Sequence, residues 1–254
     1  MRNNMKRYSI LILAVVCCLE MLACFSLAGD RSGELMVFAG AGMRRPLVEI
    51  GEHFYQQSGI KIMYDFEGSG RLGNKILVGQ KPDVFIPGSE KWAKILRDKG
   101  HIQDYTPIAY HTPVVITPPG NDNVKSLTDF TNQSNRIVLG DLKAAAIGRV
   151  SDRIFQKAGL DPSKIEVKAR GLTVKQLVAW IEGKNADASI VWQADATQSG
   201  KVKTIAIPEK WNVIARIPVC QLNGSGPGAS TFVDYLRGVE GKSIFSKHGF
   251  RTVE

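Results

Sequence analysis

The sequence predicts an α/β protein in which two lobes, each a mostly parallel sheet flanked by helices, meet at a hinge with a ligand cleft. Three observations lead to this fold class. From Glu34 onward, short apolar runs alternate with amphipathic stretches, the pattern of successive βα units. Near Tyr110, closely spaced prolines interrupt the alternation before it starts again. After the second series, one apolar run leads into two helical segments.

The first series contains three βα units. Its first helix carries Pro46 in the opening turn, where a missing N–H is harmless, and places apolar side chains at helical spacing. Gly100 follows the third helix as a C-terminal cap. Such units predict a parallel sheet with helices on its faces. The expected strands cover residues 35–38, 60–66 and 83–86, and the helices cover residues 43–57, 72–78 and 90–99.

The second series predicts the second lobe. Its expected strands cover residues 114–117, 137–139, 165–167 and 188–191, with helices over 146–158 and 174–182. A last strand over 214–219 precedes helices over 231–236 and 241–247. Because these helices have no further sheet before them, we expect the chain to return to the first lobe. Residues 29–110 and 211–254 then form lobe one, residues 111–210 form lobe two, and the ligand binds between them.

Residues 1–28 are typical of an export signal, with a positively charged head, an apolar run over 10–19 and small residues near the end. Glu20 interrupts the apolar run well before the roughly 20 residues that a membrane span needs. Cleavage after Ala28 competes with lipidation at Cys24, and the ragged end of the signal favours cleavage. Both alternatives predict a periplasmic protein.

The composition excludes several classes of protein. A formal net charge of +9 suits an anionic ligand or an anionic membrane face, although a merely basic surface explains it equally well. No basic run is interleaved with aromatic residues, so we expect no nucleic-acid partner. Cys220 is the one cysteine outside the signal, and the four histidines lack ligand spacing, so neither a disulfide scaffold nor a metal site is expected. No Ser/His/Asp trio presents itself, and we expect neither an enzyme nor a cofactor.

The segment GSGRLG over residues 68–73 matches the G-x-G-x-x-G pattern between a strand and a helix. A dinucleotide site is one interpretation, but the periplasm does not supply nicotinamide cofactors. A plain structural turn is another. We favour a cradle for a small oxyanion, because glycines let the backbone N–H groups approach the ligand and Ser69 adds a hydroxyl donor.

Three further segments contain candidate anion contacts. In the segment FAGAGM over residues 38–43, the backbone N–H groups of Gly42 and Met43 would face the cleft, unless the small residues serve only tight packing. Val174 opens a helix that Thr173 can cap. Trp192 directly follows a strand, and its indole either packs in the core or donates its N–H to an anion.

In this order, these segments resemble the periplasmic molybdate-binding proteins of ABC importers, which have the two-lobed type II solute-binding fold. The resemblance runs through nearly the whole mature chain. It is carried by residues 37–39, 66–70, 82–86, 90–92, 140–141, 146–148, 174–176, 185–192, 232–236 and 249–250.

The resemblance implies a binding site. In that family, two serines and several backbone N–H groups hold the oxyanion. The second serine falls on Ser69, whereas the first falls on Gly42, which has no hydroxyl. The small residue of the second-lobe loop falls on Ile147, the valine on Val174 and the tyrosine on Trp192. The expected ligand-binding residues are therefore Gly42, Met43, Ser69, Ile147, Val174 and Trp192.

The resemblance also implies a function. Lobe closure would capture molybdate or tungstate, the metal entering only as its oxyanion, and an ABC permease in the cytoplasmic membrane would recognise the closed monomer. Three alternatives remain. They are a binding protein for another oxyanion or a small organic anion, a ligand sensor that signals to a membrane partner, and a secreted enzyme that uses the glycine segment for a nucleotide.

Overall fold

The computed structural model describes residues 33–254. The predicted export signal, with its alternatives at Ala28 and Cys24, lies outside the described residues. No helix in the described part of the chain is long and apolar enough to cross a membrane.

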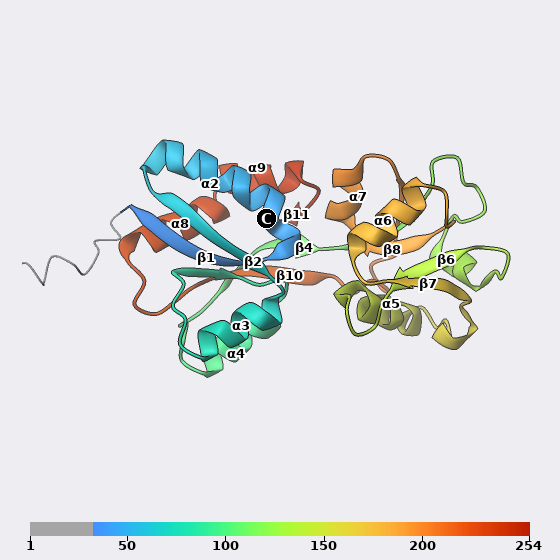
Figure 1. Ribbon diagram of the computed structural model, residues 1–254, viewed down its shortest axis with the longest axis horizontal. Coiled ribbons are helices and arrows are strands. Elements are labelled where there is room, and N and C mark those ends of the chain that lie inside the picture. Colours follow the sequence, from blue (N-terminus) through green and yellow to red (C-terminus); the bar gives the residue numbers. More distant parts are fainter. Residues whose placement is uncertain (1–32) are drawn as a thin grey trace, which may run out of the picture. The chain divides into compact units, whose positions relative to one another are not determined.

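One large sheet of six strands has the order β11-β4-β10-β3-β1-β2. These strands are β1 (Glu34–Gly40), β2 (Lys61–Glu67), β3 (Val84–Ile86), β4 (Thr106–His111), β10 (Ala215–Gln221) and β11 (Arg251–Thr252). Figure 1 shows one group of helices above this sheet and a second group below it. The first group is α2 (Arg44–Ser58), α8 (Pro227–Arg237) and α9 (Val239–Lys247), and the second is α3 (Ser69–Leu77) and α4 (Glu90–Asp98).

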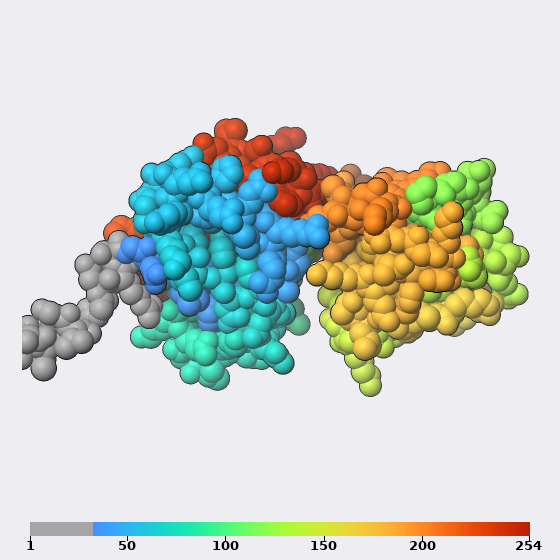
Figure 2. All heavy atoms as spheres, turned by 45° about the horizontal axis from the view of Figure 1, so that its top comes forward, coloured from blue at the N-terminus to red at the C-terminus, as the bar shows by residue number. Residues whose placement is uncertain are grey.

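Each face of the large sheet has its own core. Under α2, α8 and α9, Leu47, Phe54 and Phe232 are buried together with Phe245. Figure 2 shows α9, in red, against α2, in blue, where Lys247 also pairs with Glu49 at 2.7 Å. Under α3 and α4, the core includes Leu72, Phe85, Leu96 and Cys220. Burial raises the pKa of the Cys220 thiol. The C-terminal helices therefore pack on the sheet that the N-terminal strands begin.

The other strands form two small sheets with the orders β8-β5-β9 and β6-β7. A parallel bridge between Ile137 and Ala188 links them. Their helices α5 and α6 lie on opposite sides of the strands, and α7 follows β8 (Figure 1). The strands are β5 (Pro113–Thr117), β6 (Ile137–Gly140), β7 (Val167–Gly171), β8 (Ser189–Trp192) and β9 (Lys203–Ala206). The helices are α5 (Ala146–Lys157), α6 (Val174–Glu182) and α7 (Gln193–Ser199), with short 3-10 helices η1 (Ala41–Met43), η2 (Leu127–Thr131) and η3 (Pro162–Lys164).

The predicted alternation is confirmed for most elements, but the sheets are mixed rather than mostly parallel. Strands β1 and β3 are parallel, as are β6 and β7. In contrast, β10 is antiparallel to both β3 and β4, and β5 is antiparallel to both β8 and β9. The reason is that β10 enters the large sheet from the second series of elements rather than through a βα crossover beside its neighbours.

Candidate functional site

The predicted glycine segment lies inside a helix rather than in a loop before it. Gly68 is the N-cap of α3, and Ser69 is the first helical residue. A Cβ on Gly73 would come within 2.1 Å of the Trp92 ring, and one on Gly70 within 3.6 Å. Gly73 therefore makes room for the indole, whereas a Cβ on Gly70 would only make an ordinary van der Waals contact with it, so packing explains one glycine of the G-x-G-x-x-G pattern without a nucleotide. What remains for a ligand is the start of α3, with the first N–H groups and the Ser69 hydroxyl.

Ser69, Gly88 and His111 form a hydrogen-bonded chain. The Gly88 N–H donates to Ser69 Oγ at 2.9 Å, and His111 Nδ1 lies 3.2 Å from the Gly88 carbonyl oxygen. Because the hydroxyl accepts from Gly88, its own hydrogen is left to donate. Because a carbonyl only accepts, Nδ1 carries the proton, and Nε2 of the neutral ring carries a lone pair.

The imidazole of His111 brings three predicted positions together. Its ring stacks on Trp192 with centroids 4.9 Å apart and 20° between the planes, and lies 5.7 Å from the Phe250 ring. A Cβ on Gly42 would lie 4.0 Å from His111 Nε2. Burial lowers the pKa of His111 to about 4, against the opposing effect of the bond to Gly88. The ring is therefore neutral at physiological pH and borders Gly42, Trp192 and, through Gly88, Ser69.

Sequence reasoning missed His111. The histidines were judged only by metal-ligand spacing, and strand β4, which ends at His111, was not predicted. The available signal was the position of His111 at the break between the two series of elements, two residues before Pro113.

The turn at Gly42 offers backbone rather than side chains. Gly42 is exposed in η1, whereas the Met43 side chain is fully buried, so only the main chain of Met43 can reach a ligand. The arginines that follow are engaged elsewhere. The Arg44 guanidinium lies 4.3 Å from the centre of the Phe66 ring, and Arg45 donates to the Gln198 carbonyl at 3.5 Å.

Ile147 likewise can present only its backbone, because its side chain is fully buried near the start of α5. The loop before it is tight. A Cβ on Gly148 would come within 2.4 Å of the Gly140 carbonyl oxygen. Asp141 Oδ1 accepts from the N–H groups of Lys143 and Ala144, each at 2.8 Å, and these bonds hold the pKa of Asp141 below its usual range.

Val174 is the first residue of α6, and the predicted cap at Thr173 is confirmed, since Thr173 Oγ1 accepts from the Gln176 N–H at 3.2 Å. Strands β6 and β7 are adjacent and parallel, so α5 and α6 begin beyond the same edge of their sheet. Val174 and Trp192 both pack against the core cluster that contains Ile147. The structure thus groups Gly42, Ser69 and Trp192 around His111, and groups Ile147, Val174 and Trp192 on one core.

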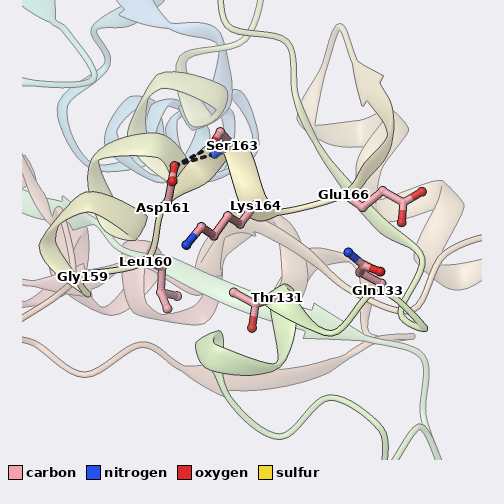
Figure 3. Close-up of a pocket in the computed structure, with 8 residues that line it drawn as sticks. All are labelled: Thr131, Gln133, Gly159, Leu160, Asp161, Ser163, Lys164 and Glu166. Atoms are coloured by element: carbon pink, nitrogen blue, oxygen red, sulfur yellow. Dashed lines mark hydrogen bonds between the residues drawn. The ribbon is translucent and has the colours of Figure 1, made fainter.

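A separate polar pocket of about 720 Å³ lies elsewhere (Figure 3). Asp161 caps η3 there by accepting from Ser163, and the Lys164 side chain is beside it. The lining residues are Thr131, Gln133, Gly159, Leu160, Asp161, Ser163, Lys164 and Glu166. None of the predicted contact residues is among them, and the described residues contain no cluster of three or more His, Cys, Asp or Glu that could hold a metal ion.

Comparisons with known proteins point to one family of binding proteins. The family model "Bacterial extracellular solute-binding protein" matches residues 35–251. The molybdate-binding protein ModA of Escherichia coli is 28% identical over 239 residues, which cover 89% of this chain and 93% of the relative.

Solved structures give the same picture. The substrate-binding domain of a putative molybdenum ABC transporter from Clostridium difficile superposes with a TM-score of 0.78 at 24% identity, covering 87% of this chain and 99% of that one. The L-phospholactate-bound PEB3 has a TM-score of 0.68 at 20% identity over 85% of this chain and 99% of that one. These matches confirm the predicted two-lobed type II solute-binding fold.

Proposed function

The chain belongs to the bacterial extracellular solute-binding proteins, and on that premise we propose that it captures a tetrahedral oxyanion, molybdate or tungstate, for an ABC importer. The observation that carries the proposal is the start of α3. There the Ser69 hydroxyl, tied to the Gly88 N–H at 2.9 Å, keeps its hydrogen for a ligand beside the first N–H groups of the helix. Neutral donors of this kind suit an anion that brings its own charge.

The nearby charges do not compete with an anion. Glu67, two residues before Ser69, is occupied by Lys75 at 2.9 Å and Arg71 at 3.4 Å. The positive end of the α3 dipole also favours a negative charge at this position.

The proposed contacts come from both lobes. Gly42, Met43 and Ser69 would hold the anion from lobe one, made of residues 29–110 and 211–254. The backbone N–H groups of Ile147 and Val174, together with Trp192, would approach from lobe two, made of residues 111–210. Closure of the lobes would then remove the anion from water, and the closed form would dock on a permease in the cytoplasmic membrane. In this proposal the protein works as a monomer in the periplasm. Its N-terminal signal exports it and is then cut after Ala28, or Cys24 is lipidated.

A small organic anion is the second candidate. Gly42 lacks the hydroxyl that the molybdate-binding family has at this position, and Met43 adds only backbone, so lobe one supplies one hydroxyl donor fewer. PEB3, one of the structural relatives, was solved with L-phospholactate, a ligand that carries both a phosphate and a carboxylate.

Calorimetric titration of the mature chain with molybdate, tungstate, sulfate and phosphate tests the proposal. Tight binding of molybdate and tungstate with silence for sulfate is expected. The Ser69→Ala variant should lose roughly 10- to 100-fold in affinity, because one donor to a buried anion is removed (about 1.5–3 kcal/mol). Ser134→Ala, an exposed serine in a loop of lobe two, is the matched control and should bind as the native chain does. Silence for all four anions would refute the oxyanion proposal.

A further inference from the structure

We propose that His111 is a ligand-contacting residue of this site, and that a fully ionised oxyanion binds together with one proton taken up at His111 Nε2. The inference rests on the proposed function, and it adds a titratable donor to a site whose other donors are neutral. It also makes the protonation state of the protein part of ligand selection.

The orientation of the ring carries the first step. His111 Nδ1 is committed to the Gly88 carbonyl at 3.2 Å, so the ring cannot present its N–H to the Gly42 turn. The Trp192 indole stacks on the face of the His111 ring with centroids 4.9 Å apart, and this contact restrains rotation of the imidazole. Nε2 therefore borders Gly42, where the absence of a Cβ leaves room beside it.

The chemistry of Nε2 carries the second step. In the neutral ring this nitrogen is an acceptor, and it would repel the bare oxygen of a dianion. Once protonated, it donates a charge-assisted hydrogen bond in place of the hydroxyl that Gly42 lacks. The flat indole of Trp192 also stabilises a cation stacked against it. Binding the dianion and binding the proton therefore favour each other.

In the protein without ligand, the His111 ring is uncharged. Because burial lowers the pKa of His111 to about 4, the ligand must favour the charged ring by about a thousandfold for the proton to be retained at pH 7. A dianion within hydrogen-bonding distance in a closed site is a strong enough partner, since a nearby opposite charge shifts such groups by several units when water is excluded.

Charged side chains on the surrounding elements have partners of their own. Arg216 on β10 pairs with Glu90 at 3.0 Å, and the Arg251 guanidinium on β11 lies over the Tyr110 ring. On α7, the carboxylate of Asp195 interacts with the charges of Lys175 and Arg45. Arg44 of α2 lies over the Phe66 ring, and Glu49 of α2 pairs with Lys247 and with His248. Among the described residues, the His111 ring lies against Gly88, Trp192, Phe250 and Gly42, which are all uncharged.

The test is calorimetric titration of the mature chain with molybdate at pH 7 to 8.5, where this anion stays fully ionised, in buffers of different ionisation enthalpy. We expect uptake of at least about half a proton per anion bound at pH 7, and an affinity that falls with rising pH by as much as tenfold per unit while the bound ring stays protonated. Binding without proton uptake and with an affinity independent of pH would overturn the inference and leave the proposed function standing. Absence of binding by any of the four oxyanions would overturn both.

One variant removes the titrating nitrogen, Nε2, but keeps a donor in the place of Nδ1. In His111→Asn the amide can still donate to Gly88 but cannot titrate, so proton uptake and the pH dependence should disappear, with a 10- to 100-fold loss of affinity at pH 7. The exposed His53→Asn on α2 is the control and should keep both. Retained proton uptake in His111→Asn would overturn the assignment. If that variant does not fold, the proton count of the native chain alone decides.

Discussion

Glycines near the starts of two helices, α3 and α5, have different structural roles. In α3, Gly73 makes room for the indole of Trp92, and the polar group left at the helix start is the Ser69 hydroxyl. At the start of α5, Gly140, which ends β6, and Gly148, in the first turn of the helix, let two backbone segments touch. The first arrangement leaves a side chain that could contact the proposed ligand, whereas the second can present only main-chain N–H groups. Similar glycine content therefore predicts neither the same neighbours nor the same chemistry.

The two helix starts differ in what an added side chain would strike, a movable side chain at α3 and fixed backbone at α5. An added methyl group at α3 would meet an aromatic side chain, which has other rotamers. An added methyl group at Gly148 would meet the backbone carbonyl groups of Gly140, at the end of β6, and Asp141, which accepts from the Ala145 N–H. Three substitutions, in order of decreasing expected effect, test this difference between the two regions and the connection between them.

Gly148→Ala should have the largest effect. Its Cβ would lie 2.4 Å from the Gly140 carbonyl oxygen and 2.6 Å from that of Asp141, so the backbone of α5 must shift. We expect a loss of about 3 kcal/mol or more in the free energy of unfolding, measured by denaturant titration. Gly33→Ala, where no atom lies within 4 Å of the added Cβ, is the control and should change stability by no more than about 0.5 kcal/mol. If Gly148→Ala and Gly33→Ala are equally stable, the backbone before α5 can shift to accept the added methyl group at no measurable cost.

Gly73→Ala should cost less, about 1–3 kcal/mol, because the Trp92 ring that it strikes can rotate away. Combining it with Trp92→Leu removes the obstacle. In a double-mutant cycle, Gly73→Ala should therefore cost clearly less in the Trp92→Leu background than in the native one. Purely additive losses would show that Gly73 serves something other than the indole.

Asp195→Asn should have the smallest effect, and it probes the connection between the two regions, because Asp195 interacts with Arg45 of α2 and Lys175 of α6. Burial raises the pKa of Asp195 to about 6, so the folded state favours the protonated acid. The stability that this group contributes is present below its ordinary pKa and is lost as pH rises through about 6. The variant should therefore be more stable than the native chain at pH 7.5, by about 1–2 kcal/mol, and equal to it below about pH 4.

Thermal unfolding across this pH range measures the difference. Asp122→Asn, an exposed position, is the matched control. A constant difference between Asp195→Asn and the native chain from pH 4 to 8 would exclude titration of Asp195 as its cause.

The elements that the sequence predicted best have local signals. Helix α6 has the expected bounds, Val174–Glu182, because a capping threonine precedes an amphipathic run. Strand β4 was missed because Pro107 interrupts its pattern, and Pro218, opposite it on β10, sits at an irregularity of the pairing. Helix α7 was missed because its small and polar residues show no apolar face, and only tertiary packing of Ala194 and Ala196 explains it.

The candidate site divides in the same way. Ser69 could be found because a serine at a helix start is visible in the sequence. The link from Ser69 to His111 could not, because it passes through the backbone of Gly88, and backbone carbonyls leave no trace in residue identity. For Trp192 the sequence leaves both core packing and ligand contact open; its ring packs against the core of lobe two and stacks on His111, and the ligand contact stays a prediction.

The buried thiol of Cys220 has a practical consequence for following motion. Its side chain is fully shielded in the core of the large sheet, and its raised pKa keeps it protonated, so labelling reagents that need a thiolate will not modify it. Chain cut after Ala28 carries no other cysteine. Fluorophores or spin labels on two engineered surface cysteines, one per lobe, would therefore report inter-lobe distance directly, with the native chain as an unlabelled blank.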